Sequence, residues 1–165
     1  MATFNAAGTK TYMHIIPLQI LTLEQQGYHI LVEVKLFDTV HKMVVDTGAS
    51  KTVLDKSMLI QAGMTETALI TSNILSTGLG TNAMESHTFK LDNFSIADWS
   101  CKSIEVAVLD LSTINYAYTQ MGIPPIIGVL GGDILVQFGG IIDYKKRTLR
   151  LNKNRRKQNE QMAVL

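Results

Sequence analysis

The segment MVVDTGAS places one carboxylate where a buried strand is expected to end. Asp46 follows three apolar residues, so we expect its carboxylate to be partly desolvated and held by nearby donors, because an unpaired buried charge is costly. Gly48 allows a close backbone approach and can offer its N–H to that carboxylate. Thr47 adds a hydroxyl that can bond to neighbouring backbone, and Ala49 and Ser50 keep the turn small. A carboxylate fixed in this way suits acid–base chemistry, although an acid after a strand can also be a turn former or a helix cap.

A hairpin is expected to present this turn. Residues 29–37, HILVEVKLF, alternate apolar and polar side chains with the period of two that is typical of a half-buried strand. Residues 40–45 form a second expected strand, and Asp38-Thr39 is the expected connection between the two. The hairpin therefore ends directly at Asp46.

The rest of the chain is predicted to contain further strands, giving at least seven, and at most three short helices. An expected strand over residues 12–21 contains Pro17, which marks an edge or a bulge. The other expected strands cover residues 68–75, 86–91, 103–111, 126–130, 141–144 and 148–151. The expected helices cover residues 54–62, 112–122 and 131–139, and the pattern of the second is ambiguous.

Three segments, in this order along the chain, resemble the retropepsin-like aspartic proteases. The first is MVVDTGAS, which is similar to the family signature of two apolar residues, Asp-Thr-Gly, Ala, and then Ser or Thr. The second is IGVLGGDIL, residues 127–135, which resembles the family segment that crosses beside the catalytic loop and leads into a short helix. The third, residues 138–151, is similar to the closing hairpin of retropepsin-like domains in bacteria and eukaryotes. The resemblance covers roughly residues 25–152.

The resemblance implies a mainly β fold, a single-lobe closed β-barrel or sandwich with a flap hairpin and one or two short helices. It implies that Asp46 is catalytic and that no cofactor or metal takes part. The implied supporting residues are Thr47, Gly48, Ala49 and Ser50 in the active-site loop, Thr77, Gly78, Leu79 and Gly80 in the flap, and Ile127 and Gly128 in the segment that packs against the loop.

The chemistry of this family needs two carboxylates that share a proton, one to activate water and one to protonate the scissile carbonyl. Asp110, Asp133 and Asp143 are the other acids weighed, but no hydroxyl-glycine pair follows any of them. We expect Asp133 to lie at a helix N-terminus and the other two to end strands or form turns. Because the chain is too short for two such lobes, a homodimer that brings together two copies of Asp46 is expected.

The predicted function is therefore an aspartic endopeptidase that cleaves an extended polypeptide substrate. Two alternatives are a catalytically weak or inactive peptide-binding dimerisation module of the same fold, and an adaptor that binds nucleic acid through a basic tail. Residues 145–157 carry eight of the fifteen Lys and Arg, whereas residues 1–144 have a net charge of −6. A solvated basic end is favoured over nucleic-acid binding, because no aromatic residues are interleaved with the charges.

The composition fits one domain of 165 residues, 46% of them hydrophobic. We expect an N-terminal segment with an edge strand over residues 1–24, the protease domain over 25–152, and a basic, disordered tail over 153–165. No secretion signal is visible and no apolar run could span a bilayer, so a cytoplasmic protein without membrane contact is expected. The four histidines lack metal-ligand spacing, and the single cysteine, Cys101, can form no internal disulfide and has no histidine pattern for thiol catalysis.

Overall fold

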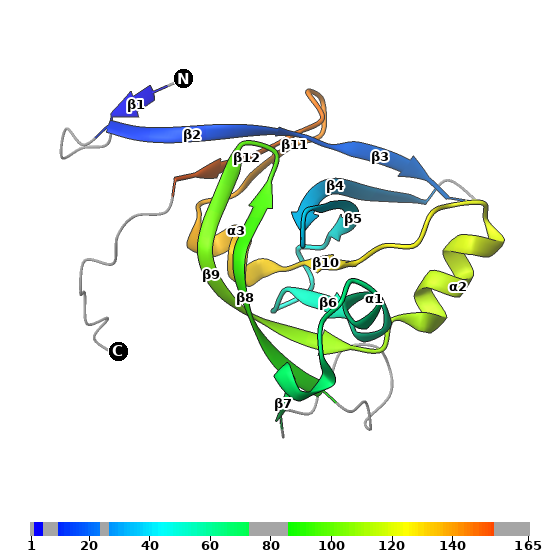
Figure 1. The fold of residues 1–165 in the computed structure, drawn as a ribbon. Helices are drawn as coiled ribbons and strands as arrows, with labels where there is room; N and C mark the ends of the chain where they lie inside the picture. The colour runs from blue at the N-terminus through cyan, green and yellow to red at the C-terminus, as the bar shows by residue number, and fades with distance from the viewer. Residues whose placement is uncertain (1, 5–9, 24–26, 73–85, 154–165) are drawn as a thin grey trace, which may run out of the picture.

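The computed structural model describes residues 2–4, 10–23, 27–72 and 86–153, and these are mainly β (Figure 1). The strands are β1 (Ala2–Phe4), β2 (Lys10–Pro17), β3 (Gln19–Thr22), β4 (Tyr28–Leu36), β5 (Thr39–Val45), β6 (Val53–Asp55), β7 (Ile70–Ser72), β8 (Ser86–Ile96), β9 (Trp99–Leu109), β10 (Gly128–Leu130), β11 (Ile141–Asp143) and β12 (Thr148–Asn152). The helices are α1 (Lys56–Gln61), α2 (Ser112–Gln120) and α3 (Gly132–Gln137), with one 3₁₀ turn, η2 (Glu66–Ala68). The predicted flap residues Thr77, Gly78, Leu79 and Gly80, and the tail from residue 154 onward, lie outside the described residues.

Six strands close into a barrel in the order β4-β5-β10-β6-β9-β8, because β8 pairs back with β4. β3 and β7 extend this sheet outside the ring, on β4 and β8 respectively. β10 runs parallel to β5 and antiparallel to β6, so it separates two strands that are consecutive in the chain. The loop from β5 to β6 must therefore cross the end of β10. The predicted mainly β, closed-barrel fold is confirmed.

Alternating side chains of the barrel strands form the main core. Val32 and Val34 of β4 point inward, and the charged residues between and after them are exposed. Trp99 is fully buried and packs edge-on against Phe94 and Phe138, with ring centroids 6.2 and 4.8 Å apart. Such aromatic packing inside the closed barrel stabilises the register of the strands, and the loops project from the ends of these strands.

A second sheet, in the order β1-β2-β12-β11, packs the ends of the chain together. The single strand predicted over residues 12–21 is wrong in one respect, because it divides at Leu18 into β2, which pairs with β12, and β3, which pairs with β4. The backbone N–H of Leu18 leaves both ladders and donates to the carbonyl oxygen of Arg147. Pro17 cannot donate a hydrogen bond, so the division falls where the ladder is already interrupted.

Two tight turns differ from the sequence expectation. The β4–β5 connection consists of Phe37 and Asp38, not Asp38-Thr39, and both have positive φ, 48° and 62°. Paired positive φ values match the twist of a two-residue hairpin, which explains the shift by one residue. The strands predicted at 86–91 and 103–111 are also longer and form one hairpin, with Ile96 paired to Trp99.

The helices follow their predicted positions; α1 and α3 start later than expected, and α2 starts at the expected residue. α1 begins after Asp55, whose carboxylate accepts the N–H of Met58 at 2.8 Å. Leu54, expected in this helix, belongs instead to β6, because Asp55 is the N-cap that sets the helix start. Ser112 starts α2, which resolves the ambiguity of that segment in favour of helix. None of the helices in the described part of the chain has the length and apolar composition needed to cross a membrane.

A small second cluster lies outside the main core and binds α2 to the barrel. We call it the outer cluster; it comprises Leu31, Tyr118 and Ile126, with Leu21, Val44, Ile114 and Ile123 packed around them. Figure 1 shows α2 standing outside the barrel. The segment that carries α2 is therefore packed against the barrel as part of the fold.

Candidate active site

The predicted catalytic loop crosses the end of β10 as the topology requires. Asp46 directly follows the last residue of β5, and its backbone N–H donates to the carbonyl oxygen of Leu130 at 3.0 Å. Its own carbonyl oxygen accepts the N–H of Ala49 at 3.3 Å, which closes the turn. Strand geometry therefore extends up to the backbone of Asp46, and the side chain stands where the sheet ends.

One oxygen of the Asp46 carboxylate is fixed within the turn. Oδ1 accepts the N–H of Gly48 at 2.8 Å, the bond that the sequence suggested. A Cβ at position 48 would lie 3.2 Å from the same oxygen, so a larger residue would crowd the carboxylate. The N–H of Gly48 holds Oδ1 in one position, and the absence of a side chain at Gly48 leaves room for that oxygen.

The expectation that Asp46 is partly desolvated is wrong for the single chain, in which Asp46, Thr47 and Gly48 are all exposed. Val45 points into the main core, but the turn that follows lies outside the barrel wall. The bond predicted from the Thr47 hydroxyl to neighbouring backbone does not form within the described residues. Among the described residues, the turn is therefore an exposed surface, and the Thr47 hydroxyl on it has no hydrogen-bond partner there.

A buried hydrogen-bond network supports the loop from behind. Asp133 Oδ1 accepts the Thr52 N–H at 2.9 Å and the Thr52 hydroxyl at 2.7 Å. The Thr52 oxygen in turn accepts the N–H of Gly131 at 3.1 Å, and the Thr52 side chain is completely buried. The N–H of Gly132 donates to the carbonyl oxygen of Ala49 at 2.7 Å. These bonds tie the loop to the start of α3, so Asp133 lies in the first helical turn, as predicted, and also braces the loop.

Glycines allow the closest backbone contacts of this arrangement. A Cβ at Gly128 would lie 2.0 Å from the carbonyl oxygen of Val53, and one at Gly131 would lie 2.4 Å from that of Lys51. Only glycine permits such an approach without moving the backbone. Ile127 is fully buried and donates its N–H to the carbonyl oxygen of Lys42 at 2.8 Å. Ile127 and Gly128 thus lie beside β5.

The remaining weighed acids have structural partners. Asp110 accepts the N–H of Ser112 at 2.8 Å, and hydrogen bonds from Ser112 hold the pKa of Asp110 below its usual value. Asp143 accepts the N–H of Lys146 at 2.9 Å across the turn that follows β11. Neither lies in the catalytic loop, and both roles agree with the turn and strand-end assignments.

Sequence reasoning missed Thr52 and Asp55. Asp55 follows an apolar pair just as Asp46 does, yet it is 1% exposed, and its Oδ2 accepts the N–H of Leu111 at 2.8 Å. Its second oxygen caps α1, so both oxygens are committed to backbone donors. A polar residue directly before a short apolar strand was the available signal for Thr52. Among the described acids that were weighed, together with Asp55, none can act as a second carboxylate beside Asp46.

Other catalytic chemistries find little support in the described residues. No group of three or more histidine, cysteine, aspartate or glutamate side chains there could hold a metal ion. Cys101 is buried, and burial raises the pKa of its thiol to about 11. A thiol in that environment is a poor nucleophile.

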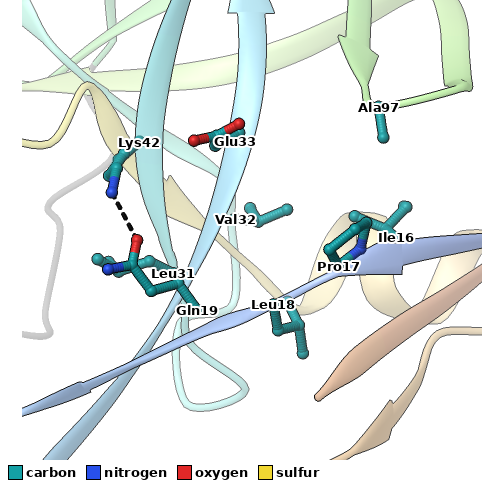
Figure 2. A pocket seen from close by; sticks show the side chains of 9 residues that line it. All are labelled: Ile16, Pro17, Leu18, Gln19, Leu31, Val32, Glu33, Lys42 and Ala97. Atoms are coloured by element: carbon teal, nitrogen blue, oxygen red, sulfur yellow. Dashed lines mark hydrogen bonds between the residues drawn. The ribbon is translucent and has the colours of Figure 1, made fainter. Parts of the chain in front are cut away.

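A cavity of about 320 Å³ lies between β2, β3, β4 and β5. Figure 2 shows the bond from Lys42 Nζ to Gln19 Oε1, 2.5 Å long, beside Glu33 and an apolar lining that includes Leu18 and Val32. No residue of the Asp46–Ser50 turn contributes to it. The candidate active site is therefore the open turn and not this cavity.

The comparisons with known proteins agree with this geometry. Residues 32–134, more than half of the chain, match the aspartyl protease family. No curated protein matches the sequence. A solved retropepsin-like aspartic protease from Rickettsia conorii is similar over 87% of this chain and 92% of its own, with 24% identity and a TM-score of 0.52.

Two further solved structures are more distant. The retroviral protease-like domain of Ddi1 from Leishmania major has 15% identity and a TM-score of 0.49, over 73% of this chain and 86% of its own. The EIAV protease complexed with the inhibitor HBY-793 has 21% identity and a TM-score of 0.48, over 70% of this chain and 92% of its own. The Rickettsia likeness shows the fold of this chain.

Proposed function

This chain belongs to the aspartyl protease family, and we propose that it is an aspartic endopeptidase whose active site forms when two copies bring their Asp46 residues together. The observation that carries the proposal is the state of Asp46 in one chain. Its carboxylate is exposed on a rigid turn, while Asp55, Asp110, Asp133 and Asp143 are committed to backbone donors. One chain thus supplies half of a two-carboxylate site.

The second half would come from the partner by twofold symmetry. Two carboxylates a few ångströms apart cannot both ionise, so the pair holds one proton between them and titrates as a unit. The exposed turn leaves room for such an approach, and the Thr47 hydroxyl is available for a bond to the partner chain. In a symmetric dimer, the same turn then faces its copy across the axis.

The chemistry assigned to this pair is hydrolysis of a peptide bond. The ionised carboxylate removes a proton from a water molecule, whose oxygen attacks the scissile carbonyl carbon. The protonated carboxylate donates to the carbonyl oxygen, and the tetrahedral intermediate then breaks at the C–N bond with a proton transferred to the leaving amine. Because the N–H of Gly48 fixes Oδ1 of Asp46, the backbone of the loop would also determine where the attacking water and the shared proton lie.

The test compares cleavage of a mixed peptide library between pH 4 and 7 by the wild type and by Asp46→Asn. Asp38→Asn is the matched control, because it makes the same change at an exposed turn residue far from the catalytic loop in the hairpin register. We expect cleavage by the wild type and the control, and at least about a hundredfold loss in Asp46→Asn, since a general acid–base group contributes roughly 10²–10⁴.

Assembly provides a second test. We expect the specific activity to rise with protein concentration and to reach a plateau where sedimentation shows a dimer. A chain that cleaves peptides while monomeric at every working concentration would contradict the shared-carboxylate mechanism. Peptide binding without any cleavage would instead favour the binding-module alternative.

A further inference from the structure

His29 and Tyr118 form a hydrogen-bonded pair between β4 and α2. His29 Nδ1 lies within hydrogen-bonding distance of the Tyr118 hydroxyl, and the two rings are tilted by 51° with centroids 5.7 Å apart. Tyr118 is 3% exposed, whereas His29 is only half-buried. The tyrosine is thus hidden in the outer cluster, and the imidazole extends from it toward the surface.

This pair lies on the face of the sheet to which the Asp46 side chain belongs. Along β5, Val45 points into the main core and Val44 into the outer cluster. Since side chains alternate and the backbone stays extended up to the N–H of Asp46, the Asp46 side chain falls on the same face as Val44. The outer cluster and the candidate active site therefore share one face.

The strand register indicates where His29 lies relative to Asp46 on that face. β4 and β5 pair antiparallel up to Leu31 opposite Val44, and beyond that pair His29 is paired with Leu21 of β3. Continued by two residues on each strand, the β4–β5 register would place His29 opposite Asp46. His29 also occupies the same face as Leu31, which agrees with its bond to Tyr118 in the outer cluster. Extended in this way, the register puts the partly exposed imidazole on the side of the sheet that leads to the turn where a substrate would be cleaved.

The bond to Tyr118 determines what this imidazole can offer. Burial raises the pKa of Tyr118, so its hydroxyl stays protonated, and we assign the tautomer in which this buried hydroxyl donates its proton to Nδ1. In that tautomer Nδ1 is the acceptor and the ring proton resides on Nε2. His29 therefore presents an N–H donor at Nε2.

α2 is held firmly enough to orient this donor. The Asn115 side chain donates to the carbonyl oxygen of Ile126 at 3.1 Å and accepts its N–H at 2.9 Å. The N–H of Ile123 also donates to the carbonyl oxygen of Tyr118 at 2.9 Å. These bonds therefore tie the helix that carries Tyr118 to the segment that leads into β10.

We propose that His29 is a substrate-contacting residue that selects polypeptides with an aspartate or glutamate side chain close to the scissile bond, and that Tyr118 is its positioning residue. The inference rests on the proposed proteolytic function for its biological meaning. A carboxylate accepts from an imidazole N–H more strongly than an amide does, because the hydrogen bond is charge-assisted. Through Tyr118, α2 thus contributes to a polar recognition element on the face that carries Asp46.

Two substitutions separate substrate recognition from a structural link. His29→Asn keeps a polar atom near the place of Nδ1, so the link to Tyr118 survives while the donor at Nε2 is lost. His29→Gln keeps a polar atom near the place of Nε2 and loses the link. His14→Asn is the matched control, because His14 is a partly exposed histidine that pairs with Asp98 at 3.1 Å in the second sheet.

The experiment measures peptide binding in the Asp46→Asn background, where no catalysis is needed, by selection from a peptide library followed by fluorescence polarisation with Glu and Gln versions of a selected peptide. We expect about tenfold tighter binding of the Glu peptide, reduced to about equal binding in His29→Asn and unchanged in His14→Asn. Tyr118→Phe should weaken the preference without removing it, since the ring still packs but the orienting hydroxyl is gone.

Each outcome decides the proposal. The proposal is overturned if the wild-type His29 chain and the His29→Asn variant prefer the Glu peptide equally. It is also overturned if the peptides selected from the library show no enrichment of Asp or Glu at any position. Loss of thermal stability in His29→Gln with an unchanged peptide preference in both variants would assign the pair a purely structural role. Binding selectivity with no cleavage by the wild type would refute the proposed catalysis while leaving this inference intact.

Discussion

Replacement of Thr52 by valine should destabilise the fold, because the Thr52 hydroxyl forms hydrogen bonds with both Asp133 and Gly131. The substitution keeps the shape of the side chain, so no cavity forms at this fully buried position. It removes the 2.7 Å bond to Asp133 Oδ1 and leaves the N–H of Gly131 without the oxygen that it contacts at 3.1 Å. Gly131 is itself buried, so water cannot easily replace that acceptor.

The magnitude follows from these two losses. A hydrogen bond to a charged group contributes about 1.5–3 kcal/mol, and a buried donor left unsatisfied costs about 1–3 kcal/mol. Because Asp133 keeps the N–H donors of Thr52 and Ile134, the lower half of the combined range applies, about 3 kcal/mol. For a chain of this size that corresponds to a decrease in Tm of about 6–12 °C.

The assay is urea and thermal unfolding followed by far-ultraviolet circular dichroism at one fixed protein concentration. Thr119→Val is the matched control, because the Thr119 hydroxyl makes a single 2.9 Å bond to the carbonyl oxygen of Asn115 on an exposed helix. We expect the control to change stability by less than about 0.5 kcal/mol. A double-mutant cycle with Asp133→Ala should show coupling of about 1 kcal/mol or more. If Thr52→Val matches the control, or the cycle shows no coupling, then the network does not brace the loop.

Three further outcomes are expected. Gly131→Ala should lower the unfolding free energy by at least about 2 kcal/mol and reduce kcat, since its Cβ would lie 2.4 Å from the carbonyl oxygen of Lys51; urea unfolding and peptide cleavage measure the two effects. Cys101 should react with a thiol reagent at pH 8 more than about a hundredfold more slowly in the folded chain than in urea, because burial raises its pKa to about 11. Burial lowers the pKa of His41 from 6.5, so the folded state binds fewer protons in acid. Stability attributable to His41 should be complete above pH 6.5 and decline as the pH falls through its folded pKa, and His41→Gln should remove that decline in acid unfolding curves.

Local patterns were sufficient to predict the hairpin and the turn that follows it. The alternation over residues 29–37 places Val32 and Val34 inside, as the barrel has them, and the Asp46–Gly48 bond follows from two neighbouring residues. Such features depend on side-chain period and on turn geometry, both of which are legible in a short segment.

Features that depend on distant segments were not predictable in the same way. Thr52 and Asp133 are 81 residues apart, and their bond exists only because β10 inserts between β5 and β6. The burial of Asp55 also requires Leu111, 56 residues away, although its sequence context is as apolar as that of Asp46. The exposure of one acid and the burial of the other are set by tertiary packing, which the local sequence does not encode.

The proposed chemistry requires that Asp46 has a fixed position and an environment in which two carboxylates share a proton. The exposure of Asp46 indicates that a single chain provides the position and not the environment. The network of Thr52, Asp133 and Gly131 fixes the position of the loop within one chain and is formed before any partner arrives. The environment that makes two carboxylates share a proton, close like charge and exclusion of water, is missing from the isolated turn. Under the proposed mechanism a second copy must supply both, so the monomer would be positioned for catalysis but chemically silent. Premature cleavage is then limited by assembly, and the strength of the dimer becomes the quantity that sets activity at a given concentration.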